Sequence, residues 1–264
     1  MTLRIAVGGA TGWTGSAVCK GVHASDDLSL VAAVARSTAG QDLGEVISSE
    51  YWGVPIVATV AEALADADVY VDFTKHQVVK AHVLEAIAAG VAVVVGTSGL
   101  TAADYDEIDA AARAKGVAAF AAGNYALLAA LAQSAALGVA THVPTWEVID
   151  YASFTKPDVP SGTARELAEK LSAVHAPTIG VPVRDIAGPQ EARGADIDGT
   201  RVHSVRLPGF VVSTEVVFAL PGQRLTIRFD AGDSPQPYVD GVLLAVRALT
   251  GRVGLTRGLD SLLG

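Results

Sequence analysis

Leu3-Arg4-Ile5-Ala6-Val7-Gly8-Gly9-Ala10-Thr11-Gly12-Trp13-Thr14-Gly15 is the stretch that decides the fold of the first half of this chain. Residues 3–7 form an apolar run that predicts a buried parallel strand, and residues 16–22 predict a helix. A second apolar run, 28–35, follows within the length of one βαβ unit. The glycines between strand and helix have the spacing Gly-x-x-Gly-x-x-Gly, a variant of the dinucleotide fingerprint. We therefore expect a dinucleotide to contact Gly9, Thr11, Gly12, Trp13, Thr14 and Gly15.

The end of the second strand bears on which dinucleotide binds. Proteins that bind NAD place an acid there, which bonds the ribose 2′-hydroxyl, whereas proteins that bind NADP place a cation there for the 2′-phosphate. This strand ends in Ala35-Arg36-Ser37-Thr38, with no acid at its tip. Arg36 can pair with a phosphate and Ser37 can donate a hydroxyl, so we expect NADPH with NADH tolerated. The alternative is that Arg36 is a solvated loop cation.

Strands and helices alternate through residues 1–125, as a doubly wound parallel sheet requires. The runs 69–74, 91–95 and 117–121 predict strands, and 75–89 and 101–115 predict helices. Ligands of such sheets lie beyond the carboxyl ends of the strands. Further cofactor contacts are therefore expected at Phe73, Thr74, Gly96, Thr97, Ser98, Gly123, Asn124 and Tyr125.

From Trp146 the pattern changes to short β-branched runs at 146–151, 200–207, 214–220 and 224–230, without full helices between them. Such runs favour a mixed or antiparallel second sheet. We predict an α/β protein with two domains. A Rossmann-like dinucleotide-binding domain spans 1–125, with a C-terminal helix at 241–264 packing back on it. A substrate-binding and oligomerisation domain of α+β type spans 126–240.

Composition narrows the function. The formal net charge of -9, with no cluster of basic residues, argues against a nucleic-acid partner. The single cysteine, Cys19, allows no internal disulfide, and neither cysteine nor histidine has metal-ligand spacing, so we expect a cytoplasmic protein without a bound metal. The apolar runs are too short or too rich in alanine to predict a membrane span.

A second motif, Lys156-Pro157-Asp158-Val159-Pro160-Ser161-Gly162-Thr163-Ala164, places a cation before a predicted helix start. The residues from Ala164 to Ala173 are good helix formers, so Ser161 or Thr163 is a natural N-cap. The free N–H groups of such a start bind anions, and the two hydroxyls add donors. The segment therefore predicts a carboxylate site with Lys156 beside it. The alternative is an ordinary capped surface helix.

Four blocks of the sequence together resemble the bacterial dihydrodipicolinate reductase family, and the resemblance runs nearly end to end. The blocks are residues 9–15, Val71-Asp72-Phe73-Thr74, residues 95–100 and residues 156–164; a fifth stretch, 193–228, is also similar. The resemblance implies an NAD(P)H-dependent reductase of the lysine and diaminopimelate pathway, usually a tetramer. It further implies that Lys156 donates a proton while Ser161, Gly162 and Thr163 hold a carboxylate of the small-molecule substrate.

The chain departs from the family pattern just before the lysine. The family has Glu-x-His-His-x-x-Lys where this chain reads Asp150-Tyr151-Ala152-Ser153-Phe154-Thr155-Lys156. A family histidine further on is replaced by Phe229, and the arginine expected a few residues later falls near Pro235. We therefore expect Phe229, together with Tyr151 or Phe154, to line the substrate pocket in place of the missing cations.

These departures leave three interpretations. The first is the family reaction, hydride transfer that converts 4-hydroxy-tetrahydrodipicolinate to tetrahydrodipicolinate. The second is a paralogue that reduces another imine or enamine, because a pocket with fewer cations loses affinity for a dianion. The third is a non-catalytic NADPH-binding sensor.

Tyr151 and Lys156 are five residues apart and Pro157 follows, so they cannot form the helical Tyr-x-x-x-Lys pair of short-chain dehydrogenases.

Overall fold

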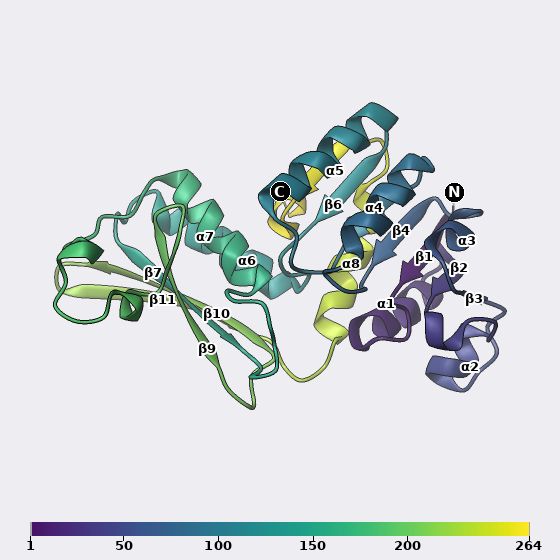
Figure 1. The fold of residues 1–264 in the computed structure, drawn as a ribbon, viewed down its shortest axis with the longest axis horizontal. Coiled ribbons are helices and arrows are strands. Elements are labelled where there is room, and N and C mark those ends of the chain that lie inside the picture. Colours follow the sequence, from purple (N-terminus) through teal and green to yellow (C-terminus); the bar gives the residue numbers. More distant parts are fainter. Residues whose placement is uncertain (1, 264) are drawn as a thin grey trace. The chain divides into compact units, whose positions relative to one another are not determined.

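The computed structural model describes residues 2–263 and divides the chain into two compact units (Figure 1). One unit comprises Met1–Tyr125 and Pro235–Gly264, and the other comprises Ala126–Ser234. The second unit is thus inserted into the first in sequence.

The first unit is built on one sheet in which all paired strands are parallel, in the order β12-β6-β5-β4-β1-β2-β3. Its strands are β1 (Leu3–Gly8), β2 (Leu28–Val34), β3 (Ile56–Val57), β4 (Val69–Asp72), β5 (Ala92–Val95), β6 (Ala118–Ala121) and β12 (Gly254–Arg257). Its helices are α1 (Trp13–His23), α2 (Leu43–Ser48), α3 (Val60–Leu64), α4 (Val79–Ala88), α5 (Ala102–Lys115) and α8 (Gln236–Ala248), with 3₁₀ turns η1 (Arg36–Thr38) and η4 (Leu259–Leu262). The predicted doubly wound sheet is confirmed.

Local sequence explains where these helices begin and end. Thr59 and Glu62 form a capping box at the start of α3, and Thr101 with Asp104 forms another at the start of α5. Such boxes satisfy N–H groups that a helix start leaves unpaired. Gly116 closes α5 in the left-handed conformation, with φ of 73°, which glycine adopts without steric cost.

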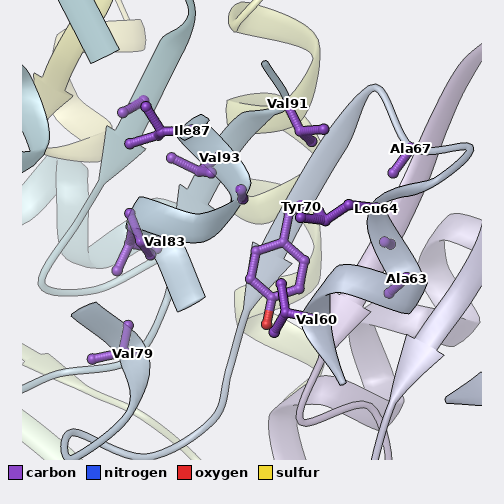
Figure 2. Packing of buried hydrophobic residues seen from close by; sticks show 14 of the residues in the cluster. Val60, Ala63, Leu64, Ala67, Tyr70, Val79, Val83, Ile87, Val91 and Val93 are labelled. Atoms are coloured by element: carbon purple, nitrogen blue, oxygen red, sulfur yellow. The ribbon is translucent and has the colours of Figure 1, made fainter. Parts of the chain in front are cut away.

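One part of the core of the first unit lies between the sheet and helices α3, α4 and α5. The ring of Tyr70 on β4 packs beside Val60 and Leu64 of α3, as Figure 2 shows, and Val83 and Ile87 of α4 continue the cluster. Strand β1 lies between β2 and β4, so the glycine-rich turn leaves the sheet from an interior strand next to the central one.

The predicted C-terminal helix is present as α8 and packs on α1 of the first unit, but its predicted bounds of 241–264 are wrong. Helix α8 ends at Ala248, and residues 254–257 form β12, which pairs with β6 at the edge of the parallel sheet. Gly251 and Gly254 have φ of 75° and 84°, a conformation that ends a helix. The predicted boundary at residue 240 falls inside α8, which belongs to the first unit.

The second unit has a five-stranded sheet in the order β11-β10-β7-β9-β8. Its strands are β7 (Trp146–Ala152), β8 (Ala195–Ile197), β9 (Thr200–Arg206), β10 (Val212–Leu220) and β11 (Gln223–Asp230). Strands β7 and β9 are parallel and the other pairs are antiparallel, so the predicted mixed sheet is confirmed. The short turns η2 (Val183–Asp185) and η3 (Gln190–Arg193) precede β8.

Helices α6 (Leu127–Ala140) and α7 (Gly162–Val174) cover one face of this second sheet (Figure 1). Trp146 and Val148 of β7 pack there with Phe218 of β10 and Leu171 of α7. Side chains alternate between the two faces of a strand, so Asp150 and Ala152 also point to this covered face. None of the helices formed by the described residues combines the length and apolar character that a bilayer crossing requires.

Candidate cofactor and substrate sites

The glycine-rich turn after β1 has the geometry of an anion cradle. Gly9 has φ of 72°, and a Cβ on it would lie 2.2 Å from the carbonyl oxygen of Phe73. A Cβ on Gly15 would lie 2.1 Å from the carbonyl oxygen of Gly9. Gly12 is the N-cap of α1 and no side chain caps this helix start. The first-turn N–H groups can therefore receive a pyrophosphate, whose charge the helix dipole favours.

The other residues predicted to contact a cofactor at this turn are accessible. Thr11 and Trp13 are exposed and Thr14 is half-buried. The Trp13 ring meets Tyr238 edge-on with a 6.0 Å centroid separation. Arg36 and Ser37 are exposed in η1, at the carboxyl end of β2, where a ribose 2′ substituent lies in proteins of this fold.

The loops after β4 and β5 meet at a buried acid that the sequence reasoning did not single out. Asp72 is 0% exposed, and its Oδ1 accepts from the N–H of Thr74 at 3.0 Å and from the hydroxyls of Thr74 and Thr97, each at 2.7 Å. Burial acts to raise the pKa of Asp72, but hydrogen bonds from His82, Thr74 and Thr97 outweigh it and hold the pKa below its ordinary value. An acid ending the apolar run Val-Tyr-Val-Asp was the available sequence signal.

Aromatic rings flank the same loops. A Cβ on Gly96 would lie 2.2 Å from the ring of Phe73, and the ring of Phe73 meets Tyr125 edge-on at 6.2 Å. Tyr125 is buried and its hydroxyl donates to the carbonyl of Val95 at 2.8 Å. The predicted contact of Tyr125 is thus limited to its ring or backbone. Ser98 is half-buried after β5, while Gly123 and Asn124 follow β6.

Lys156 lies in the loop between β7 and α7 and is three-quarters buried. Its Nζ is 2.8 Å from Oδ1 of Asp158, while Oδ2 of Asp158 is buried without a hydrogen-bond partner. The backbone N–H of Lys156 donates to the carbonyl of Ser153 at 2.9 Å, which closes the loop. The ammonium group is therefore held by a carboxylate two residues away. Asp158 was not among the predicted site residues.

A buried acid also fixes the start of α7. Asp150 is 0% exposed and accepts from the N–H and hydroxyl of Ser161, at 2.8 and 2.6 Å, from the hydroxyl of Ser204 at 3.1 Å and from Arg206 at 2.8 Å. Arg206 also donates to the carbonyl of Asp158 at 2.8 Å. One ion pair thus holds both the helix start and the loop that carries Lys156.

This arrangement corrects one prediction. Ser161 is the N-cap of α7, as expected, but its hydroxyl proton goes to Asp150 while its oxygen accepts from the N–H of Ala164. Ser161 is only 1% exposed, so it shapes the turn and is no free donor. Gly162 and Thr163 are the first residues of α7, where the N–H groups of a helix face outward.

The structure does not bring Tyr151 and Phe229 together. Phe229 pairs with Thr214, which pairs with Asp150, so Phe229 lies on the helix-covered face of the sheet. Tyr151 lies on the opposite face, where it stacks on Phe210 and lies under the guanidinium of Arg228. The prediction that both line one pocket is therefore wrong, because neighbouring register positions alternate between faces.

Within residues 2–263 no group of His, Cys, Asp and Glu has metal-binding geometry.

Comparison with known proteins gives one consistent family. The model described as "Dihydrodipicolinate reductase, N-terminus" matches residues 3–125, and "Dihydrodipicolinate reductase, C-terminus" matches residues 123–263. The 4-hydroxy-tetrahydrodipicolinate reductase of Desulfitobacterium hafniense is 38% identical, covering 99% of this chain and 98% of that protein. The enzyme of the same name from Moorella thermoacetica is 37% identical, covering 99% of this chain and 98% of that protein.

Solved structures agree with the sequence matches. Dipicolinate-bound dihydrodipicolinate reductase from Paenisporosarcina sp. TG-14 superposes with a TM-score of 0.75 and 28% identity, covering 99% of each chain. An amine dehydrogenase from Mycobacterium smegmatis has a TM-score of 0.67 at 16% identity, covering 98% of this chain and 96% of that one. The second likeness concerns the fold alone.

Proposed function

The chain belongs to the dihydrodipicolinate reductase family, and from this premise we propose that it reduces 4-hydroxy-tetrahydrodipicolinate, or its dehydrated form, to tetrahydrodipicolinate with NAD(P)H. The observation that carries the proposal is the match of both family models over residues 3–263, together with a lysine placed before an anion-binding helix start. This is an oxidoreductase reaction on a C=N or conjugated C=C bond.

The first unit supplies the cofactor site. The open start of α1 and the close-packed turn from Gly9 to Gly15 fit a pyrophosphate. Arg36 and Ser37 at the end of β2 fit a ribose 2′-phosphate better than a free hydroxyl, since a guanidinium pairs with phosphate. We therefore propose NADPH as the preferred cofactor, with NADH tolerated. The bound cofactor supplies the hydride.

The second unit supplies the substrate site. The start of α7, at Gly162 and Thr163, would receive one substrate carboxylate, with Ser161 and Asp150 fixing the turn beneath it. When hydride adds to carbon, negative charge develops on the atom at the other end of the reduced bond. The ammonium of Lys156, oriented by Asp158 at 2.8 Å, would donate the proton that neutralises this charge.

A second candidate rests on the altered segment before the lysine. The positions of the family's two histidines hold Ala152, which is 0% exposed, and Ser153. Neither can pair with a second carboxylate as an imidazolium would. This favours a paralogue that reduces an imine or enamine carrying one carboxylate.

The deciding experiment follows NADPH oxidation by the purified protein while a condensing enzyme makes the substrate from pyruvate and aspartate semialdehyde. We expect turnover in the wild type and in Lys115→Ala, an exposed lysine at the end of α5, and a loss of about 10²–10⁴-fold in Lys156→Ala. NADPH binding without turnover would overturn the family reaction. Turnover on a monocarboxylic imine would then identify the paralogue, and none on any imine the sensor.

Assembly and location complete the proposal. Following the family resemblance, we propose a homotetramer that works in the cytoplasm on a small-molecule carboxylate, without nucleic acid or membrane as a partner. Light scattering coupled to size-exclusion chromatography should report four chains per particle. A single-chain mass would refute the assembly without touching the catalytic proposal.

A further inference from the structure

We propose that Asp72 is a positioning residue for the nicotinamide half of the cofactor, an inference that rests on the proposed NAD(P)H site. Its buried carboxylate holds the loops after β4 and β5 in the arrangement that the ring end of the dinucleotide needs. Because Asp72 is fully buried, it acts through the threonines that surround it.

Strand order places the two halves of the dinucleotide. The pyrophosphate would be held at the start of α1, directly after β1, and the adenosine ribose at the end of β2, where Arg36 lies. Strand β2 is on one side of β1, and β4 followed by β5 is on the other. The nicotinamide half would therefore be held over the carboxyl ends of β4 and β5, where Thr74 and Thr97 lie.

The two carboxylate oxygens of Asp72 contact different parts of the fold. Oδ1 accepts every hydrogen bond from the ligand side, namely the N–H and hydroxyl of Thr74 and the hydroxyl of Thr97. Oδ2 accepts from the buried Tyr70 hydroxyl at 3.0 Å and contacts Nδ1 of His82 on α4 at 3.3 Å. One carboxylate thus joins the ends of two strands to a helix behind them.

Gly8 extends this network to β1. A Cβ on Gly8 would lie 2.0 Å from the hydroxyl oxygen of Tyr70, so only glycine at this position admits the tyrosine. Burial first, and then the charge of Asp72, raise the pKa of Tyr70, which keeps its hydroxyl protonated and donating. Gly8 stands outside the Gly9, Gly12 and Gly15 spacing, and this contact explains it.

An amide cannot replace the carboxylate without loss. Both carboxylate oxygens of Asp72 accept hydrogen bonds from the surrounding donors. An asparagine side chain would offer only one oxygen, and its NH₂ group would face the remaining donors. Asp72→Asn should therefore release either the ligand side or the core side. Releasing Thr74 or Thr97 loosens the nicotinamide loops. The turn around Gly9 packs on Phe73 but keeps hydrogen bonds that do not involve Asp72, from the N–H of Gly9 to the carbonyl of Val34 at 3.1 Å and from the N–H of Gly12 to the carbonyl of Gly9 at 2.9 Å.

The test measures the dissociation constants of NADPH, NADH and ADP by calorimetry. ADP carries the adenosine and pyrophosphate but no nicotinamide, so it reports the β1–β2 half alone. For Asp72→Asn we expect the NADPH and NADH constants to rise about tenfold, which is the worth of one charge-assisted hydrogen bond, and the ADP constant to stay within about twofold.

The matched control is Asp68→Asn at the opposite end of β4, where Asp68 pairs with Arg4. It should leave all three constants unchanged. Equal weakening of NADPH and ADP in Asp72→Asn, or no weakening at all, would overturn the positioning role. Should Asp72→Asn fail to fold, Thr97→Val, which deletes one donor to Asp72, must show the same split between NADPH and ADP. A wild type that binds none of the three would refute the proposed cofactor site instead.

Discussion

Replacing Asp150 with Asn should destabilise the second unit and loosen the start of α7. The side chain is fully buried and accepts four hydrogen bonds, from the N–H and hydroxyl of Ser161, from Ser204 and from Arg206. Asparagine keeps the shape but loses the charge and one acceptor atom. Its NH₂ group then faces donors, and Arg206 is left without its anion.

The size of the effect follows from these contacts. Removing one partner of a buried ion pair costs about 3–5 kcal/mol, because the remaining charge is uncompensated. Arg206 retains the carbonyls of Asp158 and Val205 as acceptors, at 2.8 and 3.0 Å, and its side chain is 15% exposed. Asp150→Asn should therefore lower the free energy of unfolding by about 3 kcal/mol, the lower end of that range.

Urea unfolding read by tryptophan fluorescence measures this loss, since Trp146 reports the second unit when Trp13 and Trp52 are replaced by Phe. Arg206→Met, measured alone, should cost a similar amount. The double variant should cost about 1.5–3 kcal/mol less than the sum of the two, because no unpaired charge remains. Additivity within about 0.5 kcal/mol would refute the argument that the pair acts as a unit.

Three further predictions concern the first unit. Arg36→Ala should raise the dissociation constant of NADPH about tenfold by loss of one charge-assisted contact and leave that of NADH within about twofold, and equal effects on both would refute the 2′-phosphate role. Gly15→Ala puts a Cβ 2.1 Å from the carbonyl oxygen of Gly9 and should cost about 1–3 kcal/mol in urea unfolding, so a variant as stable as wild type would contradict the geometry. Lys80, followed by hydrogen bonds from Thr101, lowers the pKa of Asp104 to about 2, so the stabilisation should be fully present above pH ~4 and vanish as the pH falls towards 2. The difference in Tm between wild type and Lys80→Met checks this. Because both side chains are partly exposed, the difference should shrink in 1 M salt, where the Debye length is about 3 Å.

Elements with a strong local pattern could be predicted from the sequence. The strand from Leu3 and the glycines after it identify the parallel sheet, because a buried strand is continuously apolar and a close turn needs glycine. The β-branched runs after Trp146 predict the second sheet in the same way. The sequence does not predict helix α6, because its alanine- and leucine-rich residues have no polar stripe that would reveal a helical period.

What sequence reasoning missed depends on contacts between residues distant in the chain. Asp150 and Arg206 are 56 positions apart, and Asp72 and Thr97 are 25 apart, so no local pattern pairs them. The sequence alone favours one pocket for Tyr151 and Phe229, because both replace or flank positions of the family's site. Strand register decides which face each side chain occupies, and register is set by pairing with a partner strand.

The strand β12 has a consequence for how the protein is made. The parallel sheet and the α1 side of the first unit are completed by α8 and β12, whose residues, 236–257, are synthesised after the entire second unit. On the ribosome, the inserted unit of residues 126–234 therefore emerges whole while β6 still presents an unpaired edge. Domains generally fold as units during synthesis, in order from the N-terminus. The first unit therefore begins first and is completed last, and until β12 is made the edge of β6 is open to pairing with another strand.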